Sequence, residues 1–443
     1  MEEKNVTLKT ELPGPASKKL GEVREKNVPK GLTSLTPVYA SEAEGALIKD
    51  VDGNVFLDFV GGIGVLNAGH CPPEVVKAVK EQVDKFLHTC FQVAPYEPYV
   101  KLAEQLNQLV PGDFPKKTML VNSGAEAVEN AVKLARRYTQ KTGIISLDCS
   151  FHGRTYLGMS LTGKVKPYRY QYGPFVPDTY KIPSPYCYRC LQYKQYPGCN
   201  IECLEFLERL FITQAEPEKI AAIIIEPVEG EGGFIVTPPE YFQKLREICD
   251  KHNILLICDE IQTGFGRTGK FLGMEHSGVV PDITTTAKSM GAGLPISGVT
   301  GRAEIMDAVG AGEIGTTYGG NPVACVAALE VLKLMKEKNL PAKSQDLGDK
   351  IFPRLKELQA KHSFIGDIRG QGAMVAFEVV KDPETKEPDP AKTTQIIGNC
   401  INSGLIVLKA GIYDNVIRML VPLVVTEEQL ASGLDILQSA IEK

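Results

Sequence analysis

The sequence predicts an α/β protein with two parts: a large domain with a mainly parallel sheet flanked by helices, and a smaller α+β domain. Two observations indicate the large sheet. Short apolar runs alternate with helical patterns up to about residue 335, and residues 254–258 (ILLIC) are apolar throughout, as in a strand buried on both faces. A third observation indicates the small domain, because helical and strand patterns mix within residues 336–443.

Size and composition exclude several classes of function. With 443 residues, 43% of them hydrophobic, the chain can bury a sizeable core and hold two or three domains. A net charge of −5, with both signs spread along the chain, argues against nucleic acid as a partner. No apolar run approaches the roughly 20 residues of a membrane span. We see no secretory signal, and eleven scattered cysteines favour reduced thiols in a cytoplasmic enzyme.

The first 70 residues are expected to form an N-terminal segment that packs with the small domain. Residues 1–45 contain four prolines and predict an irregular arm. Asp52-Gly53, between two alternating apolar runs, is typical of a hairpin turn. Residues 61–70 hold four glycines, too many for a helix, and predict either a tight backbone crossing or a close approach to a ligand.

The large domain is expected to span residues 71–335. Helical spacing of apolar residues predicts helices over 72–86 and 96–110. Next, residues 118–121 fit a strand, Asn122-Ser123-Gly124 a turn, and the following residues a helix. A strand–turn–helix of this kind aims backbone N–H groups and the positive helix end at an anion, typically a phosphate.

The next predicted strand, residues 144–148, leads into a turn that contains Phe151, His152 and Arg154. An aromatic ring at this place can stack on a flat ligand. The alternatives are a core phenylalanine, a histidine with ordinary polar partners and a surface arginine. Another predicted strand ends at Glu226 and is followed by a glycine-rich turn and a helix over 239–252.

A carboxylate and a lysine stand at the ends of two later strands. Asp259 follows the run 254–258, and Lys288 follows the β-branched run 283–287. In open α/β sheets, ligands bind just beyond the carboxyl ends of the strands. A buried carboxylate can keep a pyridine nitrogen protonated, and a lysine amine can form a Schiff base with an aldehyde. These are the two protein groups that pyridoxal phosphate chemistry needs most.

Four cysteines cluster in a tyrosine- and proline-rich segment: Cys187, Cys190, Cys199 and Cys203. Their spacing suits zinc or an iron–sulfur cluster, but the second pair is separated by three residues rather than two. We therefore expect a thiol-rich surface loop and no metal, and leave the metal as the alternative.

Six motifs in order identify the chain, from about residue 30 to its end, as resembling the class III (ω-)aminotransferases, which have the type I fold of pyridoxal-phosphate enzymes. The motifs are NSGAEAVENAVKLAR, FHGRT, IIIEPVEGEGG, CDEIQTGFGRTGK, TTTAKSMGAGLP and TTYGGNPVA. The resemblance implies a large domain with a seven-stranded sheet, and pyridoxal 5'-phosphate as cofactor.

The resemblance also implies a role for each matching residue. Lys288 should form the Schiff base with the cofactor, Asp259 should pair with its pyridine nitrogen, and Gln262 should lie near its phenolic oxygen. Phe151 and Ile261 should sandwich the ring. The other expected cofactor-binding residues are Ser123, Gly124, Ala125 and His152 near the phosphate and ring, and Thr317, which should reach the phosphate of the neighbouring subunit.

Within the family, SLTGK after FHGRT favours the branch that transfers the amino group of 4-aminobutyrate to 2-oxoglutarate, giving succinate semialdehyde and glutamate. By this resemblance Arg154 holds the ω-carboxylate, Arg418 the α-carboxylate of glutamate, and Glu231 pairs with Arg418 when glutamate is absent. Ile63 and Glu226 complete the expected substrate pocket. The alternatives are a transaminase for ornithine, 5-aminovalerate or acetylornithine, and an amino-acid racemase or epimerase. A homodimer or dimer of dimers is expected.

Overall fold

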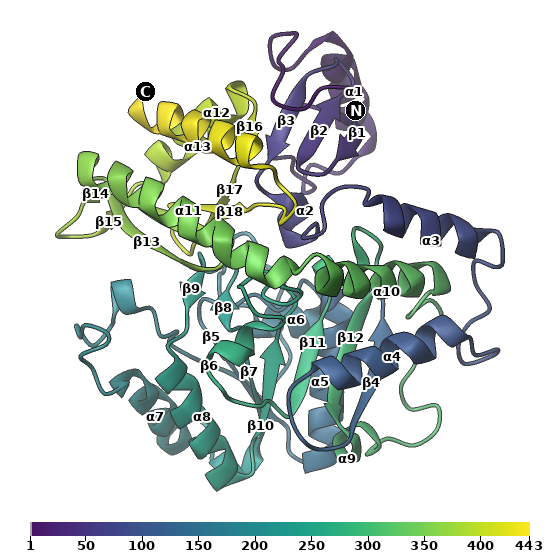
Figure 1. Cartoon of the computed structure of the whole chain (residues 1–443). Coiled ribbons are helices and arrows are strands. Elements are labelled where there is room, and N and C mark those ends of the chain that lie inside the picture. The colour runs from purple at the N-terminus through teal and green to yellow at the C-terminus, as the bar shows by residue number, and fades with distance from the viewer. Residues whose placement is uncertain (1) are drawn as a thin grey trace.

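A seven-stranded sheet forms the centre of the large domain in the computed structural model, which describes residues 2–443 (Figure 1). Strand β12 runs antiparallel to both its neighbours, and the other pairings are parallel. The predicted fold class is therefore confirmed. In spatial order the strands are β4 (Lys116–Val121), β12 (Ser297–Arg302), β11 (Ile283–Thr286), β10 (Leu255–Asp259), β7 (Ile220–Ile225), β5 (Gly143–Leu147) and β6 (Thr179–Ile182).

Helices cover both faces of this sheet, because its central strands are apolar on both sides: all six residues of β7 are buried. The helices of this part of the chain, of which α3 packs on α10 rather than on the sheet, are α3 (Pro73–Val83), α4 (Glu97–Leu109), α5 (Gly124–Thr139), α6 (Tyr156–Leu161), α7 (Glu205–Thr213), α8 (Pro239–His252), α9 (Ala303–Met306) and α10 (Pro322–Glu337). Short elements join them: β8 (Val228–Glu229), β9 (Ile235–Val236), η1 (Cys187–Arg189), η2 (Glu202–Leu204), η3 (Pro217–Lys219), η4 (Gly273–His276) and η5 (Lys288–Gly291).

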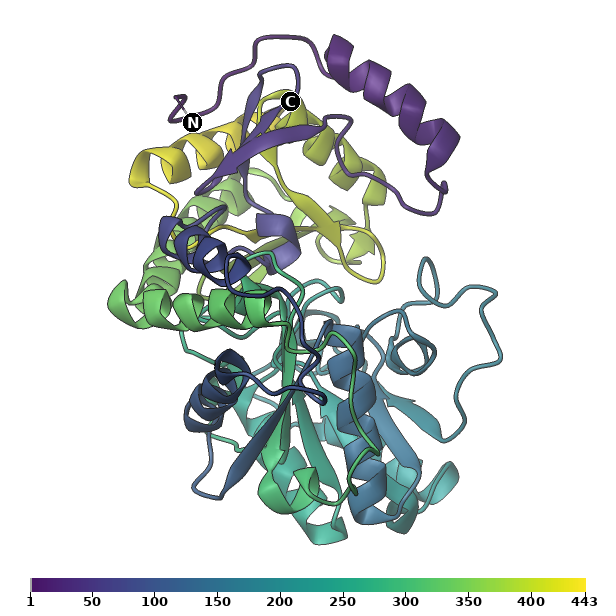
Figure 2. The same ribbon diagram turned by 90° about the vertical axis from the view of Figure 1, so that its right-hand side faces the viewer.

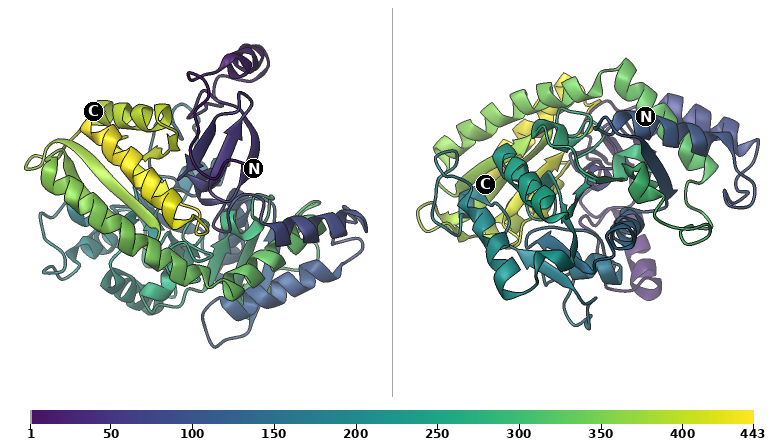
Figure 3. Two further views of the ribbon diagram at one scale, coloured as in Figure 1. Left: turned by 45° about the horizontal axis from the view of Figure 1, so that its top comes forward. Right: turned by 90° about the horizontal axis from the view of Figure 1, so that it is seen from below.

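The C-terminal part begins with α11 (Leu340–Lys361), which continues the line of α10 across the molecule (Figure 1). Its sheet has the order β13-β14-β18-β17, with β15 added on β14. Helices α12 and α13 pack against each other beside this sheet (Figure 3). The bounds are β13 (Ile365–Gln371), β14 (Met374–Asp382), β15 (Glu387–Pro388), α12 (Pro390–Asn402), β16 (Leu405–Ile406), β17 (Leu408–Ala410), β18 (Val416–Leu420) and α13 (Glu427–Glu442).

The N-terminal segment forms a small sheet in the order β1-β2-β3-β16, with strands β1 (Ala40–Glu44), β2 (Leu47–Asp50) and β3 (Val55–Asp58). Strand β16 from the C-terminal part pairs with β3 in parallel, so the N-terminal segment and the C-terminal part share one sheet. The boundaries predicted at residues 70 and 335 stay predictions. None of the helices in residues 2–443 is both long and apolar enough to cross a membrane.

The expectation of a wholly irregular arm over residues 1–45 is wrong, because α1 (Pro15–Asn27) is a helix of 13 residues at the outer edge of the molecule (Figure 2). A proline at its first position suits a helix start. Ser17 is its one buried residue, so the helix has no apolar stripe by which the sequence could reveal it.

The glycine-rich stretch after β3 forms one left-handed turn, α2 (Gly61–Gly64), rather than a right-handed helix. The φ angles are +55°, +61°, +66° and +73° for the four residues. Ile63 adopts this conformation although its branched side chain disfavours it, at a cost of about 1–3 kcal/mol. A side-chain carbon on Gly61 would lie 2.9 Å from the carbonyl oxygen of Leu420, so the turn packs directly on β18.

Candidate active site

Three residues expected to be functional gather at the carboxyl ends of the central strands. Asp259 is the last residue of β10, Glu226 follows β7, and Lys288 stands two residues beyond β11. These ends surround a cavity of about 510 Å³. Of the site residues expected from the sequence, those that line it are Ser123, Gly124, Ala125, Phe151, His152, Arg154, Glu226, Glu231, Asp259, Ile261, Gln262 and Lys288.

Three expected residues do not line this cavity in the single chain. Arg418 lies behind Glu231, to which it is hydrogen-bonded. Thr317 is exposed in the loop before α10, and Ile63 is 45% exposed on the left-handed turn. Val65, two residues further on, faces the cavity in place of Ile63.

Asp259 is a buried carboxylate held by three donors. Its Oδ2 lies 2.7 Å from Nδ1 of buried His152, and its Oδ1 accepts from the Thr285 hydroxyl at 3.1 Å and from the Ile261 N–H at 3.2 Å. These contacts fix the orientation of the carboxylate. The residue predicted to bind the cofactor ring, His152, thus contacts Asp259 within the chain, and its other ring nitrogen is buried without a partner.

Lys288 begins the short helix η5 with φ +46°, a left-handed conformation that is unfavourable for a lysine. Its amine forms no hydrogen bond or ion pair within the described residues 2–443. Burial lowers the pKa of Lys288; the Glu231 carboxylate opposes this shift, and the Arg418 guanidinium adds to it. The result is an amine that gives up its proton more readily than a surface lysine.

Helix α5 presents its N-terminus to the cavity. Ser123 caps it, because its hydroxyl accepts from the Glu126 N–H at 3.2 Å. The N–H groups of Gly124 and Ala125 lie in the first turn, where helix donors have no partner within the helix. A side-chain carbon on Gly124 would stand 2.8 Å from Cδ1 of Ile261, so glycine lets the Ile261 side chain close over this backbone.

Glu226 connects two loops of the cavity, those of Phe151 and Gly230, by hydrogen bonds. Its oxygens accept from the Phe151 N–H at 2.8 Å and from the Gly230 N–H at 2.9 Å. Burial and the Asp259 carboxylate raise the pKa of Glu226 to about 7, although His152 lowers it. The amide of Gln262 packs on Gly230, where a side-chain carbon would lie 2.4 Å from its Oε1; that oxygen is buried without a partner.

An ion pair lies beside Lys288. The Glu231 Oε1 accepts from a terminal nitrogen of Arg418 at 2.6 Å, and Arg418 also donates to the Gly230 carbonyl at 3.1 Å. Burial alone would raise the pKa of Glu231, but Arg418 and Lys288, together with hydrogen bonds from Arg418 and Tyr168, hold it below its usual value. Glu231 is therefore an ionised, nearly buried carboxylate at the cavity wall.

Two residues of the site were not foreseen from the sequence. Thr285 donates to Asp259, and its only signal is its place in the strand before Lys288. Tyr168 lies in the segment taken for a tyrosine-rich loop, yet it contacts Glu231, Arg154 and Phe151. No pattern in its own segment reports those contacts, because all three partners lie outside that segment, and Glu231 is 63 residues away.

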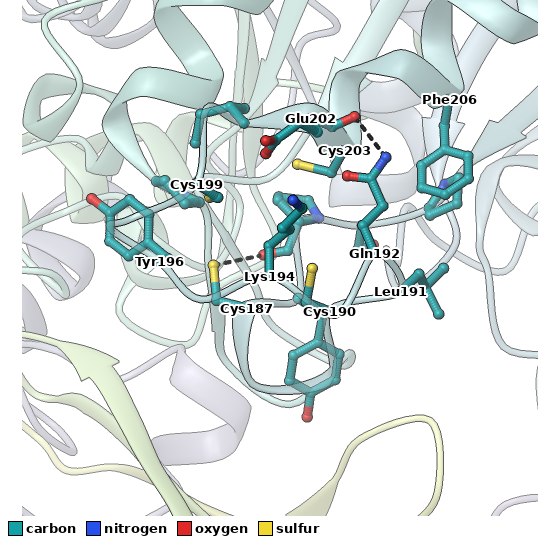
Figure 4. Close-up of a pocket in the computed structure, with 16 residues that line it drawn as sticks. Cys187, Cys190, Leu191, Gln192, Lys194, Tyr196, Cys199, Glu202, Cys203 and Phe206 are labelled. Atoms are coloured by element: carbon teal, nitrogen blue, oxygen red, sulfur yellow. Dashed lines mark hydrogen bonds between the residues drawn. The ribbon is translucent and has the colours of Figure 1, made fainter.

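The four clustered cysteines line a separate pocket together with Lys194 and Tyr196 (Figure 4). All four are free thiols. Burial and the neighbouring thiols raise the pKa of Cys187 to about 11 and that of Cys203 to about 12, so both stay protonated at neutral pH. Among residues 2–443 no three His, Cys, Asp or Glu side chains are grouped so that they could hold a metal ion. Absence of a metal here stays a prediction.

Comparison with known proteins places the whole chain in one family. The chain is 47% identical to a 4-aminobutyrate aminotransferase of Escherichia coli K12, with 97% of this chain and 99% of that protein covered. It is 48% identical to a 5-aminovalerate aminotransferase of Pseudomonas aeruginosa, with 95% and 97% covered. A solved PLP-bound amine transaminase from an uncultivated Pseudomonas species superposes with a TM-score of 0.86 at 31% identity, covering 99% of both chains.

The family profile of class-III aminotransferases matches residues 29–441, which include the strands of all four sheets of the described residues. Asp259, Lys288 and helix α5 all lie within the matched residues. The chain belongs to the class-III aminotransferases.

Proposed function

We propose that this aminotransferase moves the amino group of 4-aminobutyrate, or of a closely related ω-amino acid, to 2-oxoglutarate, giving succinate semialdehyde and glutamate. The observation that carries the proposal is the Glu231–Arg418 pair of 2.6 Å beside Lys288. One half-reaction brings one carboxylate and the other brings two, so the pocket needs a positive charge that can be neutralised internally. The 47% identity to a 4-aminobutyrate aminotransferase supports the same substrate.

As a class-III aminotransferase the protein uses pyridoxal 5'-phosphate, and the residues of the cavity fit it. The N-terminus of α5 suits the phosphate, buried Asp259 suits a protonated ring nitrogen, and the buried, unpartnered Gln262 Oε1 marks a polar position that a ligand would complete. Rotation of the terminal amide by 180° exchanges the positions of its oxygen and nitrogen. Gln262 can therefore offer either atom to a ligand. When bound, the cofactor accepts the electrons released at the substrate's amino-bearing carbon.

The chain's own groups then have distinct tasks. Lys288 holds the cofactor and afterwards moves a proton through its Nζ, which its lowered pKa favours. Asp259 offers its carboxylate to the ring nitrogen, and contacts with His152, Thr285 and Ile261 hold that carboxylate in place. Ile261 and Phe151 exclude water from the two faces of the site.

Glu231 and Arg418 form the part that senses the second carboxylate. With 4-aminobutyrate bound, Glu231 stays on Arg418 and neutralises it. With glutamate or 2-oxoglutarate, the α-carboxylate takes Arg418 and Glu231 moves aside. Arg154, exposed at the cavity wall, binds the ω-carboxylate in both cases, because a guanidinium pairs with a carboxylate through two hydrogen bonds.

A second candidate substrate is 5-aminovalerate, one methylene longer, because the 5-aminovalerate aminotransferase of Pseudomonas aeruginosa is 48% identical. A single methylene changes binding by only about 1–3 kcal/mol, so one pocket can serve both amines. Transaminases that act on ornithine or acetylornithine are the remaining alternatives among the class-III enzymes. A racemase is disfavoured, because it would need no second carboxylate clamp and this chain has both Arg154 and Arg418.

Amine-donor profiling tests the proposal. Each half-reaction is followed by cofactor absorbance, with 4-aminobutyrate, 5-aminovalerate, ornithine and glutamate as donors. We expect 4-aminobutyrate and glutamate to react best. Glu231→Gln should slow the 4-aminobutyrate half-reaction more, and Arg418→Ala should slow the glutamate half-reaction more. Equal losses in both halves for both variants would exclude the exchange of partners.

We further propose a homodimer, or a dimer of dimers. Apolar side chains are exposed near the Thr317 loop: Leu87 at 57%, Val93 at 79% and Tyr318 at 63%. Leu87 and Tyr318 lie close together, because the rings of His88 and Tyr318 are 4.9 Å apart and Asn321 donates to the Leu87 carbonyl at 3.0 Å. Exposed apolar side chains gathered in this way are typical of an interface. A cytoplasmic location stays a prediction from the free cysteines.

A further inference from the structure

Tyr168 is the point at which three side chains of the candidate site meet. Its hydroxyl donates to Glu231 Oε2 at 3.1 Å. The Arg154 guanidinium lies 4.8 Å from the centre of its ring, and the Phe151 ring meets the same ring edge-on at 4.9 Å. One tyrosine therefore contacts Arg154, which is expected to bind the ω-carboxylate, and Glu231, the partner of Arg418.

Glu231 and a residue near Tyr168 both bond to one loop of the small domain, residues 411–414. The Lys164 amine donates to the Gly411 carbonyl and to Asp414 Oδ1, both at 2.9 Å. The Gly411 N–H donates to the Glu231 carbonyl at 3.0 Å. One loop thus contacts both the Glu231 backbone and the Lys164 side chain, four residues before Tyr168.

Release of Glu231 from Arg418 has a physical difficulty. A nearly buried carboxylate that loses its charged partner is destabilised unless another donor replaces that partner. Tyr168 already donates to the Glu231 oxygen that Arg418 does not contact. Burial and Glu231 both raise the pKa of Tyr168, so its hydroxyl keeps its proton and remains a donor.

We propose that Tyr168 is a positioning residue that retains Glu231 by its hydroxyl while Arg418 binds the second carboxylate of glutamate or 2-oxoglutarate. Its ring at the same time supports Arg154, so one residue favours acceptance of both a monocarboxylate and a dicarboxylate. This inference rests on the proposed function, and it concerns the ratio between the two half-reactions rather than the identity of the amine.

Tyr168→Phe tests the hydroxyl alone, because the ring stays beneath Arg154. Loss of a hydrogen bond to a charged group should raise KM for glutamate and for 2-oxoglutarate about tenfold. KM for 4-aminobutyrate should change less than about threefold, because Glu231 keeps Arg418 in that complex. Tyr168→Leu also removes the ring and should raise KM for both kinds of substrate.

The pH dependence supplies a readout that a merely structural role would not change. Without the hydroxyl, Glu231 displaced from Arg418 should take up a proton when glutamate binds. Binding coupled to proton uptake weakens as pH rises, so KM for glutamate in Tyr168→Phe should increase with pH more steeply than in the parent enzyme. KM for 4-aminobutyrate should show no such added slope.

Tyr172→Phe is the matched control, because Tyr172 lies exposed in the same segment and should leave both KM values unchanged. Equal changes in both half-reactions for Tyr168→Phe, or an unchanged KM for glutamate, would overturn the inference.

If Tyr168→Phe does not fold, Tyr168→His replaces it, because histidine keeps a ring and a donor. The ratio of KM for glutamate to KM for 4-aminobutyrate must then equal that of the parent enzyme; a shifted ratio overturns the inference as well. If the parent enzyme converts no ω-amino acid, the proposed substrate is wrong, and the ratio between any accepted monocarboxylate amine and glutamate still decides the role of Tyr168.

Discussion

Asp259 illustrates how a buried carboxylate is held in place by its neighbours. Asp259→Asn keeps the size of the side chain and an oxygen that can accept from Thr285 and Ile261, so the free energy of unfolding should change by no more than about 1 kcal/mol. The rate should fall at least about 100-fold, because the negative charge opposite the ring nitrogen is lost. Thermal unfolding and single-turnover kinetics check the two parts separately. A variant as fast as its parent would contradict the charge role.

The lowered pKa of Lys288 predicts a pH profile for the cofactor-free protein. The reaction of Lys288 with an amine-specific reagent, followed by peptide mass spectrometry, should have a midpoint below the ordinary lysine value of about 10.4. The Glu231 carboxylate stabilises the charged amine and Arg418 destabilises it. Glu231→Gln should therefore move the midpoint further down, and Arg418→Gln should move it up. Exposed Lys270 is an internal control, and a Lys288 midpoint at or above about 10.4 would refute the prediction.

At the scale of single elements, the turn before α5 combines two tasks that substitutions at Ser123 can separate. Ser123→Ala removes the helix cap and should cost about 1 kcal/mol of stability. Ser123→Asp keeps a good cap, so the cofactor-free protein should be about as stable as its parent. The added negative charge should, however, weaken binding of pyridoxal phosphate more than about tenfold, because it faces a phosphate. Calorimetry of the cofactor-free proteins and titration with cofactor measure both effects; equal cofactor affinity in Ser123→Asp would place the phosphate elsewhere.

The elements that the sequence predicted well are those whose own residues determine them. The strand at residues 254–258 is apolar throughout and lies in the sheet as β10, with Asp259 as its last residue. Helix α1 was missed because only Ser17 is buried in it. The direction of β12 could not be read from its residues, since it depends on where the chain re-enters the sheet. Tyr168 was missed for a related reason: its hydroxyl bonds to Glu231, which is 63 residues along the chain.

At the scale of the whole molecule, the site depends on contacts between chain segments that are far apart. Strand β3 pairs with β16, Glu231 bonds to Arg418 on β18, and the turn at Gly61 packs on Leu420. The resemblance to a family could supply the partners of such contacts, because it compares whole chains. Apolar periodicity could not, because it reports only which face of one element is buried.

The proposed dimer leads to a test by mixing two inactive variants. If Thr317 reaches the phosphate of the partner's site, Thr317→Asp should damage that site by repulsion between like charges. Lys288→Ala should inactivate its own site. In a mixed dimer, the subunit with Thr317→Asp still has Lys288 and receives an intact Thr317 from its partner, so one of the two sites is complete.

Random exchange of the two variants gives mixed dimers in half of the molecules, each with one complete site. Recovered activity should therefore approach about one quarter of that of the parent enzyme. Each variant mixed with itself and treated in the same way is the control and should stay inactive. Sedimentation establishes that dimers form in every mixture. If mixed dimers form without recovered activity, Thr317 does not act across the interface; if a monomer is fully active at the assay concentration, the dimer itself is not required.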